Sequence, residues 1–81
     1  MRSLYHAIIH LREPVLPSII EPKLRVIRGV EDVQCEPSES LVTVQFDREQ
    51  TGLAEIVRAI EDSGPSVSGV AQRRIAVRRA G

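Results

Sequence analysis

Aromatic side chains are almost missing from this sequence. Tyr5 and Phe46 are the only two, and there is no tryptophan. The hydrophobic core therefore has to be built mainly from valine, isoleucine and leucine. Proteins that bind nucleic acid across a sheet stack the bases on aromatic side chains. Because only Tyr5 is available for stacking, we expect no nucleic acid among the partners.

Cysteine is just as scarce, since Cys35 is the only one. A single cysteine excludes an internal disulfide, and the default interpretation is a reducing compartment. No apolar run approaches the length of a membrane span, and the first residues are too short in apolar run for a secretory signal. We therefore expect a cytoplasmic protein without a membrane partner.

Charge is unevenly distributed, although the net charge is zero. Basic residues dominate residues 1–30 and 63–81, whereas acidic residues dominate residues 31–62. We interpret this as a solvated mixed surface followed by a basic tail. The alternative is a polarised molecule that pairs with a charged partner or with itself.

The hydrophobic pattern predicts the element order β-α-β-β-α-β. Strands are predicted over residues 3–11, 30–36, 41–47 and 66–70. The first helix is predicted to begin near Pro17–Ile19 and to end at Gly29, and the second covers residues 52–64. We place one domain at residues 1–71 and a basic tail at residues 72–81.

Several side chains define the helix ends and faces. Ser18 and Glu21 have the spacing of a capping box, and Thr51 is expected to cap the second helix. Gly29 and Gly64 are the expected stops. The core-facing stripes are Ile20, Leu24 and Ile27 in the first helix and Leu53, Ile56, Val57 and Ile60 in the second.

This order predicts an α+β fold, a ferredoxin-like sandwich with both helices on one face of a four-stranded antiparallel sheet. The first and third strands are expected in the middle, with right-handed crossovers. In this arrangement we find no Ser/His/Asp or Cys/His set and no glycine-rich phosphate loop. We therefore expect neither an enzyme nor a bound cofactor.

The segments "IIEPKLRVIRGVEDVQC", "VTVQFD" and "LAEIVRAIEDSG" resemble the heavy-metal-associated domain family. That family includes copper chaperones and the N-terminal modules of metal-transporting P-type ATPases. The similarity runs from about Leu4 to Ser68. It implies the same ferredoxin-like fold and a place in metal handling.

The first loop departs from that family, whose members carry Gly-Met-x-Cys-x-x-Cys there. Counting back without gaps from Gly29, His10 replaces the glycine and Leu11 the methionine. Glu13 and Leu16 stand in place of the two cysteines. Soft metal ions require soft ligands. Binding of such an ion through a thiolate pair is therefore not expected.

His10 and Glu13 could still hold a metal ion. Both residues flank the loop and could reach a common point, where two ligands give a weak site unless a second chain adds more. His6 is excluded from sharing that ion, because four residues along a strand span about 13 Å. A divergent metallochaperone that uses His10 and Glu13, with the site at a dimer interface, is our alternative function.

Cys35 alternates with Val33 on the core side of its predicted strand. A free cysteine in such a position usually behaves as a small buried hydrophobe. We therefore predict a structural and unreactive thiol.

The remaining signal is a set of apolar residues outside the predicted core stripes. We predict a partner-binding surface made by Val15, Leu16, Ile19 and Val26, together with Tyr5 and Ile9 on the outward face of the first strand. Clustered exposed apolar side chains mark contact sites. The predicted function is therefore a binding module that lacks the thiolate site and acts through dimerisation or docking onto a protein.

Overall fold

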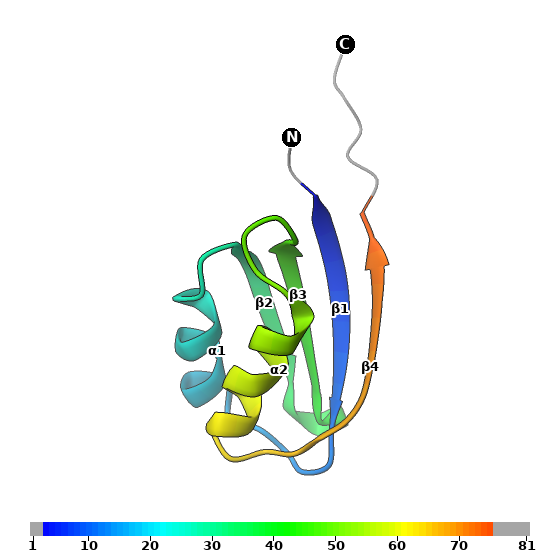
Figure 1. The fold of residues 1–81 in the computed structure, drawn as a ribbon. Coiled ribbons are helices and arrows are strands. Elements are labelled where there is room, and N and C mark those ends of the chain that lie inside the picture. The colour runs from blue at the N-terminus through cyan, green and yellow to red at the C-terminus, as the bar shows by residue number, and fades with distance from the viewer. Residues whose placement is uncertain (1–2, 76–81) are drawn as a thin grey trace.

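A computed structural model describes residues 3–75. Its helices and strands, in chain order, are β1 (Leu4–Leu11), α1 (Pro17–Arg25), β2 (Val30–Glu36), η1 (Pro37–Glu39), β3 (Leu41–Asp47), α2 (Leu53–Asp62) and β4 (Val67–Arg74). The four strands form one antiparallel sheet in the order β2-β3-β1-β4, and both helices cover the same face of it (Figure 1). The predicted ferredoxin-like fold, with β1 and β3 in the middle, is confirmed. Within the described residues, no helix has the length and apolar character needed to cross a membrane.

The core lies between the sheet and the two helices. Alternate residues of β3, namely Val42, Val44 and Phe46, are completely buried on this side. The other fully buried side chains are Ala7 and Ile9 of β1, Ile20 and Leu24 of α1, Val33 of β2, and Ile56 and Ile60 of α2. Cross-strand pairing joins Ile9 to Val42 and Ala7 to Val44. The sheet therefore has one covered face and one open face.

Helix α1 begins where the sequence predicts, but its capping is different. Leu16 is the N-cap residue and makes no side-chain capping bond, so the predicted capping box of Ser18 and Glu21 is wrong. The N–H groups of Ile19 and Ile20 instead donate to the carbonyl of Leu16 at 3.0 and 3.1 Å. Pro17, which has no N–H group to satisfy, occupies the first turn.

The predicted end of α1 at Gly29 is also wrong, because the helix ends at Arg25. Pro22 lies in the second turn, where its missing N–H group removes an intrahelical hydrogen bond. Gly29 instead forms the turn into β2 with a φ of +101°. A Cβ atom there would lie 2.8 Å from Cβ of Gln50, so both the backbone conformation and the available space require glycine.

The predicted cap of helix α2 is wrong as well, but its predicted stop is correct. Its N-cap is Gly52, and Thr51 does not cap it. The hydroxyl of Thr51 lies 3.4 Å from the carboxylate of Glu55, as a side-chain hydrogen bond. Gly64 has a φ of +120° and follows the helix end at Asp62, as expected for a glycine stop.

Strand β4 is longer than predicted. It extends to Arg74, which pairs with Tyr5 of β1, so the sheet continues past the predicted domain boundary at residue 71. The arginines at 73 and 74 therefore belong to the sheet edge. The rest of the predicted basic tail, residues 76–81, lies outside the described residues.

Candidate functional site

The loop between β1 and α1 is attached to the start of β4. The N–H group of Arg12 donates to the carbonyl of Ser66 at 2.9 Å, and the N–H group of Ser66 donates to Oε1 of Glu13 at 2.6 Å. Both contacts join residues that are more than fifty positions apart in the sequence. The loop therefore has a defined position at the end of the sheet where β1 ends and β4 begins.

A hollow of about 260 Å³ lies beside this loop. Its lining residues are Glu13, Pro14, Val15, Leu16 and Ile19 on one side and Ser63, Gly64 and Pro65 on the other. Leu16 is 62% exposed and Ile19 is 45% exposed, whereas Val15 is buried. The hollow is thus mainly apolar, with one carboxylate, Glu13, among its lining residues.

The expectation that Val15 and Ile9 are exposed is wrong. Val15 is only 6% exposed and packs into the core, and Ile9 is completely buried because β1 turns it toward the helices. The outward residues of β1 are His6, Ile8 and His10, which alternate with the buried positions. Ile9 therefore does not contact a partner directly, and Val15 packs beneath the loop as part of the core.

Tyr5 is half-buried rather than freely exposed. Its ring stacks on that of Phe46 with 6.0 Å between the ring centroids. The guanidinium of Arg48 lies 5.0 Å from the centroid of the Tyr5 ring and donates a hydrogen bond to its hydroxyl at 3.1 Å. Tyr5 already has partners within the chain, at the end of β1 opposite to the loop.

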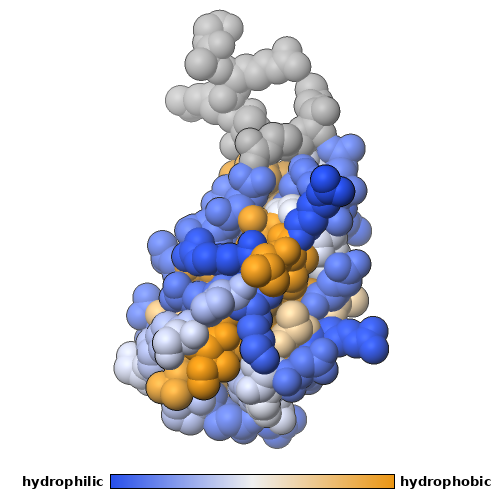
Figure 2. Space-filling view, turned by 90° about the vertical axis from the view of Figure 1, so that its left-hand side faces the viewer, coloured by the Kyte–Doolittle hydropathy of each residue, from blue (hydrophilic) through white to orange (hydrophobic). Residues whose placement is uncertain are grey.

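Val26 is exposed, as predicted, at 82%. It lies seven residues after Ile19, which places both on one side of α1. However, Val26 is not among the residues that line the hollow. Figure 2, which views the molecule from the side of α1, shows hydrophobic surface in separate areas with hydrophilic side chains between them. Because Val26 does not line the hollow, the predicted surface divides into the hollow and one separate exposed residue, Val26.

The far wall of the hollow was missed from the sequence. Ser63, Gly64 and Pro65 come from the connection between α2 and β4, which no apolar pattern marks. The predicted topology nevertheless indicates that this connection lies close to the first loop. In a β-α-β-β-α-β fold, the connections β1–α1 and α2–β4 lie at the same end of the sheet, as the pairing of Leu11 with Val67 shows.

The proposed metal ligands do not form a larger cluster. No group of three or more His, Cys, Asp or Glu side chains that could hold a metal ion occurs within residues 3–75. His10 lies on the open sheet face between Leu41 and Gly69. Glu13 lies in the loop and uses Oε1 to accept the hydrogen bond from Ser66. The described residues therefore add no third side-chain ligand to this pair.

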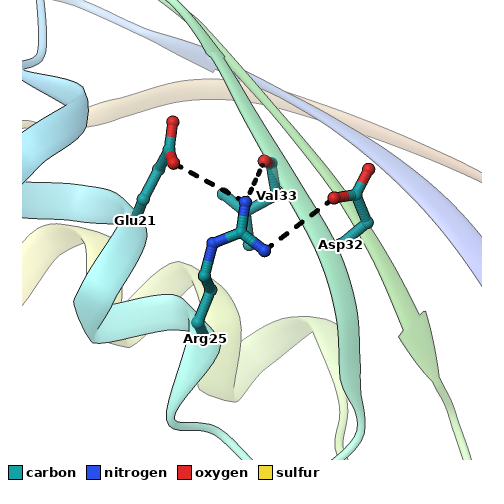
Figure 3. A network of polar contacts seen from close by, with 4 residues as sticks. All are labelled: Glu21, Arg25, Asp32 and Val33. Carbon is teal, nitrogen blue, oxygen red and sulfur yellow. Dashed lines mark hydrogen bonds and ion pairs between the residues drawn. The ribbon is translucent and has the colours of Figure 1, made fainter.

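A polar network joins α1 to the edge strand β2 (Figure 3). Nη2 of Arg25 donates to the carbonyl oxygen of Val33 at 3.0 Å and lies 3.6 Å from Oε1 of Glu21. Nη1 of the same guanidinium lies 3.9 Å from Oδ1 of Asp32. These side chains are between one third and one half exposed, so their main effect is to position α1 against β2 rather than to add much stability.

Cys35 lies on the core side of β2, where it pairs with Val42, and it is partly rather than fully buried. Burial raises the pKa of its thiol, and the nearby Glu21 carboxylate raises it further, against a lowering effect of Arg25. The nucleophilic species is the thiolate. A raised pKa therefore lowers the reactive fraction at neutral pH.

We expect Cys35 to react slowly with a thiol reagent in the folded protein and quickly after unfolding in urea. The folded thiol has both a raised pKa and reduced access. The reaction with Ellman's reagent can be followed at neutral pH and again at higher pH, where the folded protein should gain reactivity as the thiolate forms. Equal rates for folded and unfolded protein at neutral pH would contradict the structural role.

The chain has a fold of the heavy-metal-associated, metal-chaperone-like type. Because Cys35 is its only cysteine, the chain has no cysteine pair for a metal ion. Neither a family model nor a curated protein sequence matches the chain. Among solved structures, it is similar to the CopZ metallochaperone, with 26% identity, a TM-score of 0.73, and coverage of 78% of this chain and 98% of that one.

Two further structures share the fold. Oxidized MerP from Ralstonia metallidurans CH34 is 18% identical with a TM-score of 0.73, over 80% of this chain and 94% of that one. A copper binding domain from HMA7, a P-type ATPase, is 19% identical with a TM-score of 0.64, over 94% of this chain and 96% of that one. These matches confirm the resemblance to heavy-metal-associated domains at the level of structure.

Proposed function

We propose that this chain is a protein-binding module of heavy-metal-associated type, which docks onto a partner protein through the apolar hollow beside the first loop. The observation that carries the proposal is the exposure of Leu16 and Ile19 at the rim of a hollow. Leaving large apolar side chains in water is unfavourable, and a partner that covers them recovers this free energy.

The hollow suits an apolar side chain of the partner. Its lining is mainly aliphatic, with Val15 buried beneath it and the two prolines Pro14 and Pro65 at its sides. Prolines restrict the unbound backbone, and the two hydrogen bonds to Ser66 fix the loop further. Less ordering entropy is then lost on docking, which favours binding.

Metal handling provides the cellular context that we propose for this docking. The basis is the structural similarity to the CopZ metallochaperone. The loop itself does not fit a soft metal ion, because Glu13 and Leu16 occupy the positions of the two cysteines. We therefore assign the loop to protein contact. The lack of a third His, Cys, Asp or Glu ligand within residues 3–75 weighs against the alternative metal site at His10 and Glu13.

The test is a selection of displayed peptides on the natural chain, without counter-selection against any variant. We expect the selected peptides to share an apolar residue. The Ile19→Ser substitution should weaken their binding about tenfold or more, as is usual for a central apolar contact. Calorimetry measures the affinity, and NMR shift perturbation should locate the peptide at Leu16 and Ile19.

Two matched substitutions complete the test. Val26→Ser measures whether the contact extends as far as Val26, and Val70→Ser, on β4, should leave peptide binding unchanged. All three residues are exposed, so each variant should stay within about 0.5 kcal/mol of the natural stability. If Ile19→Ser destabilises the fold but leaves peptide binding intact, Ile19 is a core residue and the proposal is wrong. Perturbations located elsewhere would also contradict it.

A further inference from the structure

The face of the sheet opposite to the helices carries a regular pattern of side chains. Strand pairing places these residues on the open face: Asp32, Gln34 and Glu36 of β2; Leu41, Thr43 and Gln45 of β3; His6, Ile8 and His10 of β1; and Gly69, Ala71 and Arg73 of β4. Ile8, at 36% exposure, is a large apolar side chain near the centre of this face. Both helices lie on the opposite face of the sheet (Figure 1).

The charges on this face are separated along one cross-strand row. Asp32 pairs with Gln45, Gln45 with His6, and His6 with Arg73. The row therefore has a carboxylate at its β2 end and a guanidinium at its β4 end. Asp32 also lies 3.9 Å from Arg25, but its side chain remains 52% exposed.

Two hollows lie on either side of His6 in the same region. One, of about 190 Å³, is lined by Asp32, Gln34, Thr43 and Gln45 together with His6. The other, of about 280 Å³, is lined by Ile8, Ala71, Gln72 and Arg73 together with His6. The first offers a carboxylate and three neutral polar side chains, which is a suitable environment for a guanidinium.

We propose that this open face pairs with the same face of a second copy of the chain, about a two-fold axis parallel to the strands. Such an axis turns the row over, so that Arg73 of each copy faces Asp32 of the other, and each Arg73 enters the partner's polar hollow. Ile8 of each copy lies beside the axis and faces Thr43. The same contact, made twice about the axis, thus pairs both Asp32 and Arg73 of each copy with an opposite charge.

The charges select this axis from the alternatives. A two-fold axis across the strands would place β2 on β2 and β4 on β4, so that acids face acids and arginines face arginines. Pairing at the sheet edges is also disfavoured. On edge strand β2, the guanidinium of Arg25 already donates to the carbonyl of Val33. Edge strand β4 carries the charged residues Arg73 and Arg74, which disfavour pairing with another strand. Face-to-face packing about the strand-parallel axis remains.

The size of the face predicts a weak dimer. Four strands spaced about 4.8 Å apart, with a length of about seven residues, give roughly 400–500 Å² on each copy. The two copies together would bury roughly 800–1,000 Å², which is less than stable specific interfaces bury and is typical of weak, transient ones. The association therefore has to be measured at high protein concentration and low salt, because the charge pairs at its rim are screened.

The experiment uses sedimentation equilibrium of the full chain and two charge-reversal variants, Arg73→Glu and Asp32→Lys. Each variant alone places like charges opposite each other twice, and we expect its self-association to weaken about tenfold or more. An equimolar mixture of the two variants should restore association, because the mixed dimer pairs Glu with Lys at one end and Arg with Asp at the other.

The control is Arg58→Glu, which makes the same charge change on the exposed surface of α2 and should leave association unchanged. If loss of the Arg25 contact unfolds Asp32→Lys, then Gln34→Lys, which lines the same hollow, replaces it. A natural chain that stays monomeric at millimolar concentration would overturn the proposal, as would a mixture that does not associate. Neither result would affect the docking hollow, which shares no residue with this face.

Discussion

Replacing both Glu13 and Leu16 with cysteine is expected to give the chain tight, one-to-one Cu(I) binding that the natural sequence lacks. Ungapped counting from Gly29 aligns the two positions with the cysteines of heavy-metal-associated domains, and the structure has the fold of those domains. Leu16 is the N-cap of α1, where the positive end of the helix dipole stabilises a thiolate. The natural side chains, a carboxylate and an isobutyl group, offer no soft ligand.

Competition against a chromophoric Cu(I) chelator measures this change. We expect the natural chain to surrender Cu(I) completely and the double-cysteine variant to retain it, with an affinity higher by roughly a thousandfold or more. The matched control carries Glu13→Ser and Leu16→Ser, which removes the same side chains without adding thiolates. If the natural chain retains one equivalent of Cu(I), then our argument from the missing ligands is wrong, and the alternative with His10 and Glu13 regains support.

Replacing Ile20 with alanine is expected to lower the free energy of unfolding by about 2–5 kcal/mol, whereas the same change at Ile19 should cost far less. Ile20 is completely buried among core residues, but its neighbour Ile19 is 45% exposed at the hollow. Because the two substitutions are chemically identical and adjacent, helix propensity cancels between them. The difference then measures core packing alone. In a domain of this size, such a loss is a large fraction of the total stability.

Urea unfolding followed by circular dichroism gives both free energies from the same type of curve. The slope against urea should stay similar in the two variants, so that the midpoints report stability. Equal destabilisation at Ile19 and Ile20 would mean that Ile19 belongs to the core. It would then also remove the reason for assigning Ile19 to a contact surface, which links this measurement to the proposed function.

The sequence determined the fold of this protein through local periodicity. The alternation of Val42, Val44 and Phe46 with polar residues fixed the buried face of β3, and the repeats at Ile20 and Leu24 and at Ile56 and Ile60 fixed the buried sides of the helices. Positions that alternate or repeat in this way have only one arrangement that buries all their apolar side chains. The absence of a cysteine pair was likewise visible without a structure.

The helix ends could not be predicted as reliably. Ser18 and Thr51 are chemically able to cap, but Leu16 and Gly52 take the N-cap positions. Capping preferences are worth about 1 kcal/mol, which is small beside the tertiary contacts that position the loops before the helices. Tertiary pairing also extends β4 to Arg74. The edge of β1 that does not face β3 offers backbone hydrogen-bonding groups along its length, and the arginine side chains of β4 are exposed to solvent.

The faces of β1 and the floor of the loop were decided by tertiary structure. Both alternating sets of β1 contain apolar residues, so periodicity alone leaves open which set faces the helices. Pairing of Ile9 with Val42 settles it, because the two side chains share a face. Val15 is buried because hydrogen bonds to Ser66, far along the chain, draw the loop over the core. Sequence determined which side chains are apolar, and only contacts between distant segments decided which of them remain exposed.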